Sequence, residues 1–344
     1  MARQTTRRVT LEDVAAAAQV SRATVSRVVN GSFAVDAATA LRVESAIAKL
    51  NYVPNQAART LMTHRTNTVT LVAAETEDRV FGDPFFASII RGVSQGLAGS
   101  GWWMTIVMAH DDAQVADAAR YLAGGHTDGV LFVSEHGSHD LARSLSNIGV
   151  PVVIGGRPMD PSLRASYVDQ DNLGGAQLAA QHLARSGRSR IATITGPQDM
   201  TAGVDRLVGF QRGLGAAFDP ALVEIGDFTS ESGAAAMEAL LEREPDIDGV
   251  FAASDLMAIG ALQALSRAGR RVPDDVAVMG FDDFPLASQS SPPLSTVRQD
   301  TVEQGRRMAE LLLRRITQKP ASDASAPDYE GVILPVSVVL RASS

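Results

Sequence analysis

Residues 18–31 read AQVSRATVSRVVNG, a stretch in which two helix-forming runs come within a few residues of each other. Ser21 can begin a helix over residues 22–30, because a serine side chain accepts a hydrogen bond from the backbone of the first turn. Gly31 can end that helix, since glycine adopts the left-handed conformation with little strain. The Ala-rich run at residues 11–18 also favours a helix. We therefore expect two helices joined by a tight turn.

The second of these helices has an apolar side and a polar side. Val20, Val25 and Val28 can pack inside the motif. A helix that enters the major groove presents polar groups, because arginine matches guanine O6 and N7 and serine reaches phosphates. The pattern predicts a DNA-reading helix-turn-helix whose exposed face carries Ser21, Arg22, Ala23, Ser26, Arg27 and Asn30. An ordinary helical hairpin with a solvated polar face is the alternative.

The flanking segments complete a small all-α unit. Thr10 is a plausible N-cap for the first helix, with Asp13 in the capping-box position. A third helix is expected from near Asp36, with an apolar face formed by Val43, Ile47 and Leu50. Residues 54–62 can form a fourth helix that is too short to be stable alone.

The charge of the chain is distributed unevenly. Its 344 residues have a formal net charge of −8, but residues 1–65 hold nine Lys/Arg against four Asp/Glu. A basic head on an acidic body is expected where the head meets nucleic-acid phosphates. The absence of cysteine excludes disulfides and Cys-ligated zinc. Neither a secretory signal nor a bilayer-spanning apolar run is evident, so we expect a cytoplasmic protein with no membrane partner.

From residue 69 onward, apolar β-branched runs alternate with helical stretches. We expect strands at residues 69–74, 102–109, 129–133, 150–154, 191–195, 250–253, 276–281 and 332–340, and helices at 86–98, 173–185 and 256–268. Apolar strands separated by helices predict parallel sheets covered on both faces, and their number favours two doubly wound lobes. Ligands of such folds bind beyond the carboxyl ends of the strands, here between the lobes. The expected domains are a helix-turn-helix domain at 1–51, a helix and linker at 52–68, and a two-lobed domain at 69–344.

Several motifs resemble the LacI/GalR family of transcriptional repressors. Residues 10–31 and 52–61 (YVPNQAARTL) are similar to its N-terminal signature, and the resemblance continues in collinear order through VDQDNLGG at 168–175, RIATITGP at 190–197, ASDLMA at 253–258 and VMGFDD at 278–283. It implies an N-terminal all-α helix-turn-helix domain plus an α/β two-lobed effector domain like type I periplasmic binding proteins. The implied function is a homodimeric repressor whose affinity for double-stranded operator DNA is controlled by a small sugar.

The resemblance also implies roles in DNA binding. Positions matching Arg22, Ala23 and Arg27 touch bases in the family, and phosphates or the groove edge are held at positions matching Thr10, Ser21, Ser26 and Asn30. The hinge helix, which folds on DNA and inserts a leucine into the minor groove, is matched by Asn55, Ala58 and Leu61. Gln19 departs from the family, which usually has glycine in the tight turn. A left-handed glutamine there would cost about 1 kcal/mol.

For the effector, the resemblance implies a site formed by Asp83, Phe86, Arg206, Ser254, Asp255 and Asp282. A guanidinium and a carboxylate bind vicinal hydroxyls through charge-assisted hydrogen bonds, which suits a sugar. The alternatives are a structural salt bridge for Arg206 and Asp282, and helix packing for Phe85 and Phe86. Residues 155–158 (GGRP), 166–169 (SYVD) and 196–200 (GPQDM) are similar to cellobiose or β-glucoside repressors of actinobacteria. Glycines at 155–156 would leave room for a disaccharide.

Patterns typical of enzymes are weak. Gly92 to Gly96 fit the G-x-S-x-G pattern of hydrolases, but the serine falls inside a helical run instead of on a strand-to-helix turn. Gly213 and Gly215 lack the third glycine of a dinucleotide fingerprint. His136 and His139 have a spacing found at metal sites, but an isolated pair of this kind usually lies on the solvated surface. We therefore expect no catalytic activity, cofactor or metal. A sugar-binding protein of a transport system, or a sugar-active enzyme on a related scaffold, would be the alternatives.

Overall fold

The computed structural model describes residues 9–29, 35–53, 65–137, 149–318 and 329–344. The residues form two compact units, Met1–Thr66 and Asn67–Ser344. Some sequence predictions lie outside the described residues, namely those for Asn30, Gly31, the helix at 54–62 with Asn55, Ala58 and Leu61, and His139.

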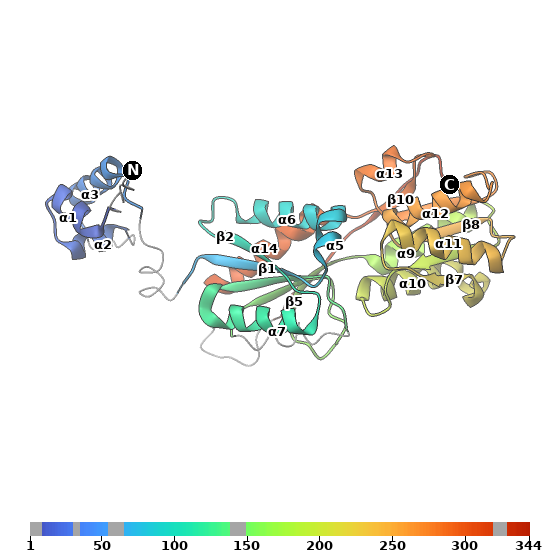
Figure 1. Ribbon diagram of the computed structural model, residues 1–344, viewed down its shortest axis with the longest axis horizontal. Helices are drawn as coiled ribbons and strands as arrows, with labels where there is room; N and C mark the ends of the chain where they lie inside the picture. The colour runs from blue at the N-terminus through green and yellow to red at the C-terminus, as the bar shows by residue number, and fades with distance from the viewer. Residues whose placement is uncertain (1–8, 30–34, 54–64, 138–148, 319–328) are drawn as a thin grey trace, which may run out of the picture. The chain divides into compact units, whose positions relative to one another are not determined.

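The first unit contains the predicted helices, α1 (Leu11–Ala18), α2 (Arg22–Val29) and α3 (Ala37–Leu50) (Figure 1). The predicted capping box of α1 is confirmed, because Thr10 Oγ1 accepts from the Asp13 amide at 3.3 Å while Asp13 Oδ2 accepts from the Thr10 amide at 2.8 Å. Ser21 Oγ accepts from the Thr24 amide at 3.1 Å, as expected for a residue that starts α2. The three helices enclose one small core that includes Val14, Val25, Val43 and Tyr52.

The turn between α1 and α2 has the strained geometry that the sequence suggested. Gln19 has φ 56° and ψ 47°, in the left-handed region. Its backbone N–H donates to carbonyls at the end of α1, and the Val20 amide donates to Ala15 at 3.1 Å. The tight turn therefore forms with glutamine in the position where glycine would be unstrained.

The second unit contains two six-stranded sheets, one in each of two lobes. Lobe 1 has the strand order β11-β5-β4-β3-β1-β2, all parallel, with strands Gly331–Leu334, Ser166–Gln170, Val152–Gly155, Gly129–Val133, Thr68–Ala73 and Trp103–Met108. Lobe 2 has the order β12-β10-β9-β8-β6-β7, with strands Ser337–Val339, Ser295–Arg298, Ala277–Asp282, Gly249–Ala252, Ile191–Thr195 and Val223–Ile225. In lobe 2 the strand β12 runs antiparallel to β10 and the other pairs are parallel. The predicted two-lobed α/β architecture is confirmed.

Helices cover both faces of each sheet. In lobe 1 they are α5 (Glu77–Gly82), α6 (Pro84–Leu97), α7 (Asp112–Tyr121) with a π-helical extension (Leu122–His126), and α14 (Thr301–Thr317). Lobe 2 has α9 (Asn172–Arg185), α10 (Thr201–Leu214), α11 (Ser230–Arg243), α12 (Asp255–Arg267) and α13 (Pro285–Gln289), with short 3₁₀ turns at Gly215–Ala217 and Pro220–Leu222. Each sheet therefore has two apolar cores, one on either face.

Glycines bring the helices into close contact, which explains two of the enzyme-like patterns. A Cβ atom on Gly92 would lie 2.0 Å from the Val302 carbonyl oxygen, and one on Gly96 would lie 2.8 Å from that of Arg306. The G-x-S-x-G pattern is thus a small-residue stripe on which α6 packs against α14, while its serine, Ser94, is exposed. Gly213 similarly packs against the backbone of α9.

The chain crosses between the lobes after β5, after β10 and between β11 and β12. For this reason α14, drawn in orange, lies among the blue and green elements of lobe 1 (Figure 1). The prediction of one final strand at 332–340 is wrong, because two strands on either side of Pro335 pair with different sheets. The sequence analysis also did not predict the strands β5, β7 and β10. These strands have only three to five residues and contain polar as well as apolar side chains, so they lack a continuous apolar run.

Candidate functional site

A cavity of about 790 Å³, open to solvent, lies between the two lobes. Its walls come largely from loops that follow the carboxyl ends of strands, the position where parallel α/β folds place ligands. Five of the six side chains expected at an effector site line it, namely Asp83, Phe86, Arg206, Ser254 and Asp282.

Asp255, the sixth predicted residue, does not line the cavity, and the expectation that it faces the cleft is wrong. The residue lies in the first turn of α12 and is 1% exposed. Its carboxylate accepts from Thr296 Oγ1 at 2.6 Å and from the Phe284 amide at 3.0 Å. Burial raises the pKa of Asp255 to about 7. This side chain holds β10 and the loop after β9 in place behind the cavity wall, where Ser254 forms the surface and caps α12.

Arg206, on α10, is 5% exposed and is fixed on several sides. Its Nε donates to Asn172 Oδ1 at 2.8 Å, and its Nη1 donates to the Ala253 carbonyl at 2.5 Å. The guanidinium lies 3.7 Å from the centre of the Phe281 ring. Nη2 makes no hydrogen bond to any residue that the structure describes, so this donor is available to a ligand. Burial lowers the pKa of Arg206, while the Asp282 carboxylate acts in the opposite direction.

Asp282 lies at the end of β9 with an unusual backbone, φ 119°. Its Oδ1 accepts from Gln299 Nε2 at 2.6 Å and lies 3.6 Å from Arg206 Nη1. Burial raises the pKa of Asp282 well above its usual value, although the Arg206 charge opposes the shift. Strained backbone of this kind is found mostly at functional sites, where the surrounding structure enforces it. Here the geometry brings the carboxylate and the guanidinium of Arg206 to the same wall.

Asp169 and Asn172 extend this polar wall, and the sequence did not single them out. Asn172 Nδ2 donates to Asp169 Oδ1 at 3.0 Å, while Asn172 Oδ1 accepts from Arg206 Nε. Burial raises the pKa of Asp169 to about 6. Both residues belong to the VDQDNLGG motif, at the first crossing between the lobes. The motif itself was therefore the available signal.

Three buried polar atoms of cavity-lining residues have no hydrogen-bond partner in the described part of the chain. They are Arg79 Nε, Gln170 Oε1 and Thr201 Oγ1. Buried polar groups are normally satisfied, and leaving one unsatisfied costs about 1–3 kcal/mol. A ligand with several hydroxyl groups could supply the missing partners.

Aromatic rings form the apolar part of the wall. Phe86 is 3% exposed and packs in the lobe 1 core, so it offers the cavity little area, while Phe85 is half-buried and lies edge-on to it. Phe228, which the sequence did not suggest, also lines the cavity and has φ 69°, a left-handed conformation that is rare for a bulky residue. Gly196 permits this arrangement, since a Cβ there would lie 2.1 Å from the Phe228 ring.

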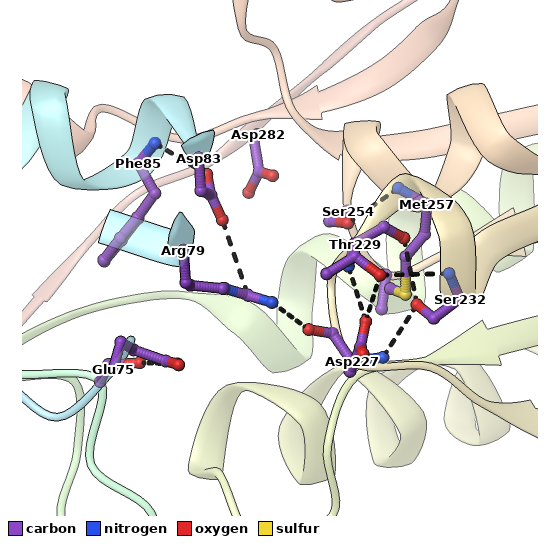
Figure 2. Close-up of polar contacts among 12 residues, drawn as sticks. Glu75, Arg79, Asp83, Phe85, Asp227, Thr229, Ser232, Ser254, Met257 and Asp282 are labelled. Atoms are coloured by element: carbon purple, nitrogen blue, oxygen red, sulfur yellow. Dashed lines mark hydrogen bonds and ion pairs between the residues drawn. The ribbon is translucent and has the colours of Figure 1, made fainter. Parts of the chain in front are cut away.

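Arg79 joins the lobes at the edge of the cavity. Figure 2 shows its side chain extending from α5 to the backbone carbonyl of Asp227, in the loop before α11 of lobe 2. The same guanidinium lies 3.6 Å from Asp83 Oδ2 and 5.7 Å from the centre of the Phe228 ring. Burial raises the pKa of Asp83, against the opposing effect of Arg79.

The two glycines at 155–156 have different roles. A Cβ on Gly155 would lie 2.9 Å from the Met308 and Val133 side chains, so this glycine is required by packing. At Gly156, with φ 112°, a Cβ would have no neighbour within 4 Å among the described residues. The open space predicted from these glycines therefore lies in front of Gly156.

The predicted DNA-facing residues of the first unit are mostly exposed, unlike the buried polar residues of the cavity. Ser21, Arg22, Ala23 and Arg27 are exposed, whereas Ser26 is half-buried. Val25 is fully buried in the core of the unit. Arg22 Nε lies 3.2 Å from Glu12 Oε1, in an ion pair whose members are both mostly exposed. Such a pair contributes little and leaves the arginine free to exchange partners.

Comparison with known proteins gives matches over nearly the whole chain. Residues 10–55 match the model of bacterial regulatory proteins of the lacI family, and residues 180–344 match that of a periplasmic binding protein-like domain. The chain is 51% identical to the HTH-type transcriptional regulator CelR of Thermobifida fusca over 315 residues, which cover 90% of this chain and 93% of that protein. The chain belongs to the LacI family. It is therefore a DNA-binding transcriptional regulator with a ligand-responsive two-lobed domain.

Other LacI-family proteins show the same likeness. The transcriptional repressor CytR of Escherichia coli K12 is 33% identical over 94% of this chain and 95% of its own length. A structure of a transcriptional regulator CelR–cellobiose complex is 46% identical, with TM-score 0.77, and covers 98% of this chain and 100% of its own. The lac repressor dimer bound to operator and an anti-inducer is 27% identical, with TM-score 0.83, and covers 98% and 99%. In the described part of this LacI-family chain, none of the helices has the length and apolar character needed to cross a membrane.

Proposed function

We propose that this LacI-family regulator is a repressor whose operator affinity is controlled by cellobiose or another short β-glucoside bound between the lobes. The observation that carries the proposal is the 46% identity, over nearly the whole chain, to a regulator whose structure is a complex with cellobiose. The cavity supports it, because cavity-lining residues contribute three unsatisfied polar atoms and several aromatic rings. A sugar has both the hydroxyl groups and the apolar ring faces that such a wall would bind.

The polar wall has the chemistry to bind vicinal hydroxyl groups. In this proposal Arg206 donates through Nη2 and Asp282 accepts through its carboxylate, two charge-assisted hydrogen bonds to neighbouring hydroxyls. Phe85 on one lobe and Phe228 on the other would pack against the sugar ring, with Phe86 supporting Phe85 from the core. The space in front of Gly156 would accommodate the second ring of a disaccharide.

For DNA, we assign Arg22 and Arg27 to base recognition, with Ala23 offering a methyl contact. Thr10, Ser21, Ser26 and Asn30 would hold phosphates or the groove edge, and Asn55, Ala58 and Leu61 would form the hinge helix. The solved lac repressor is a dimer on operator, and we propose that this chain likewise dimerises to match two half-sites. We propose a cytoplasmic location, because operator DNA is found there.

Control requires that the sugar bind one lobe arrangement better than another, because a ligand shifts an equilibrium only by its difference in affinity. We propose that sugar binding separates the two hinge segments of a dimer and releases DNA. We also propose that the chain has no catalytic activity, since Ser94 lies within helix α6 and is not on a nucleophile elbow between a strand and a helix.

A gel-shift experiment on the DNA upstream of the protein's own gene, with a panel of mono- and disaccharides, tests this function. The expected result is a specific shift that cellobiose abolishes and that galactose-based disaccharides leave intact. The affinity should fall steeply with salt, because phosphate contacts release counterions. No preference for any upstream fragment over scrambled DNA would overturn the assignment as a repressor. A specific shift that no β-glucoside changes would overturn the assignment of the effector.

A further inference from the structure

His136 connects the two lobes outside the polar wall described above. It follows β3 of lobe 1, and its Nδ1 lies 2.9 Å from Oδ2 of Asp199, which precedes α10 of lobe 2. Its Nε2 lies 3.2 Å from Oε1 of Glu75, at the end of β1 in its own lobe. The neighbouring Gly137 amide donates to the Asp199 carbonyl at 2.7 Å. Two adjacent residues of lobe 1 therefore hold Asp199 by its side chain and its backbone.

The geometry around the imidazole requires a particular protonation state. Each ring nitrogen faces a carboxylate oxygen, and an ionised carboxylate can only accept hydrogen bonds. A neutral imidazole has one donor nitrogen, so its other lone pair would face a negative oxygen. Both contacts are satisfied only when His136 is the imidazolium cation.

The groups around His136 favour that cation. Its hydrogen bond with Glu75, followed by that with Asp199, raises the pKa of His136, although burial acts against the increase. Glu75 is itself held ionised, since its bonds with His136 and Ser134 lower its pKa despite burial, with a further contribution from Arg79. The adjacent Glu135 turns its carboxylate to the Met159 amide at 3.4 Å.

Two other contacts between the lobes involve arginine. Arg157, after β4, donates to both carboxylate oxygens of Asp205 on α10, at 2.7 and 2.8 Å. Arg79 donates to the Asp227 carbonyl. Arginine stays charged at every physiological pH, so these contacts do not respond to protons. Among these three contacts, the one made by His136 can be switched in the physiological range.

We propose that His136 is a proton-controlled clasp that holds the lobes in the arrangement seen here, so that effector affinity falls as the medium becomes alkaline. A ligand that contacts both lobes binds best when the lobes are held together. The predicted change in sugar affinity therefore rests on the proposed function. The role is that of a positioning residue, since His136 acts across the lobes and not on the sugar.

The direction follows from the protonation state. Of the two carboxylates that raise the pKa of His136, Glu75 is in the same lobe and Asp199 is contributed by the other lobe. Joining the lobes therefore adds the effect of Asp199, and the clasp is fully present below the pKa that His136 has when the lobes are separated. Its contribution is lost as the pH rises through the raised value. One partly exposed, charge-assisted contact of this kind should change the affinity by roughly three- to tenfold.

Calorimetric titration of the full-length protein with cellobiose, at about pH 6 and about pH 8.5, tests the clasp. Wild-type protein should lose roughly three- to tenfold in affinity at the higher pH, whereas H136Q should bind weakly and equally at both. H110Q is the matched control, because His110 is on the surface of lobe 1 and contacts Asp111. D199N should likewise weaken the pH dependence, because the carboxylate that is lost is the one that His136 contacts on the other lobe. Equal affinities of the wild type at both pH values, or an unchanged pH dependence in H136Q, would overturn the proposal.

A measurement without sugar separates failure of the clasp from failure of the proposed effector. The chain has no cysteine, so A116C and Q211C place fluorescent labels on exposed positions of α7 and α10. The distance distribution between the lobes should broaden or shift between about pH 6 and about pH 8.5, and this change should vanish in H136Q. If cellobiose does not bind but the distance responds as expected, the effector is wrong and the clasp stands. A distance independent of pH in the wild type would overturn the clasp.

Discussion

The exposed face of α2 and the cavity between the lobes hold their arginines in opposite ways. Arg22 is mostly exposed and forms an exposed ion pair with Glu12. Arg206 is 5% exposed and is fixed by Asn172, the Ala253 carbonyl and a ring face. The Arg22 side chain is open to new partners, which we propose are DNA bases, whereas the Arg206 side chain already has its partners.

The difference shows how each site would discriminate between ligands. A preorganised cavity loses little entropy on binding and tolerates few shapes, so it suits recognition of one small molecule. An exposed helix face can adjust its rotamers to bases and to backbone phosphates, which supply most of the affinity. Substitutions should therefore cost more in the cavity than on α2, and those costs can be measured.

The largest effect is expected for R206A. Truncating one member of a buried charge pair should cost about 2–5 kcal/mol of effector affinity, because Asp282 is left without its counterion. Operator affinity without sugar should be retained, as measured by gel shift, and the dose–response to cellobiose should disappear. Thermal melting of R206A and of the conservative R206K shows whether the variants fold. An unchanged dose–response in folded R206A would remove Arg206 from the site.

A smaller effect is expected for R22A. Loss of a base contact should weaken binding to the cognate operator by about 1–3 kcal/mol and relax the preference at that base pair, with little change on non-specific DNA. R42A is a suitable control, since Arg42 is exposed on α3 and bonds to Thr39. Competition gel shifts with operators altered at single base pairs measure both quantities. If R22A kept full affinity and base preference, α2 would not read the operator through this residue.

The smallest effect is expected for Q19G. Gln19 has φ 56°, and glycine removes the left-handed strain, but part of that gain is offset by the greater freedom of glycine in the unfolded chain. The free energy of unfolding of the N-terminal unit should rise by about 0.5–1 kcal/mol, as followed by chemical denaturation. Operator preference should stay the same. A loss of stability in Q19G would mean that the glutamine side chain makes a compensating contact.

The sequence by itself determined the helical unit and the class of the body. The capping box at Thr10, the cap at Ser21 and the left-handed turn at Gln19 all depend on neighbours within four residues, so local physics is sufficient to predict them. Apolar strands alternating with helices likewise indicated parallel sheets. The family motifs then brought Arg206 and Asp282 to attention, and both line the cavity.

Only the tertiary structure decided which groups share the cavity and which lie behind it. Asp255 is adjacent to Ser254 in sequence but faces away, because the first turn of a helix directs neighbouring side chains to different sides. Phe228 gave no local signal, and the assignment of His136 to solvated surface is wrong, because it is paired with Glu75 and Asp199. The partners of both residues are contributed by distant segments and, for His136, partly by the other lobe. The split of the last strand at Pro335 has the same origin: each half pairs with a sheet whose strands come from elsewhere in the chain. Contacts between residues far apart in sequence depend on how the lobes fold around one another, and local patterns do not encode them.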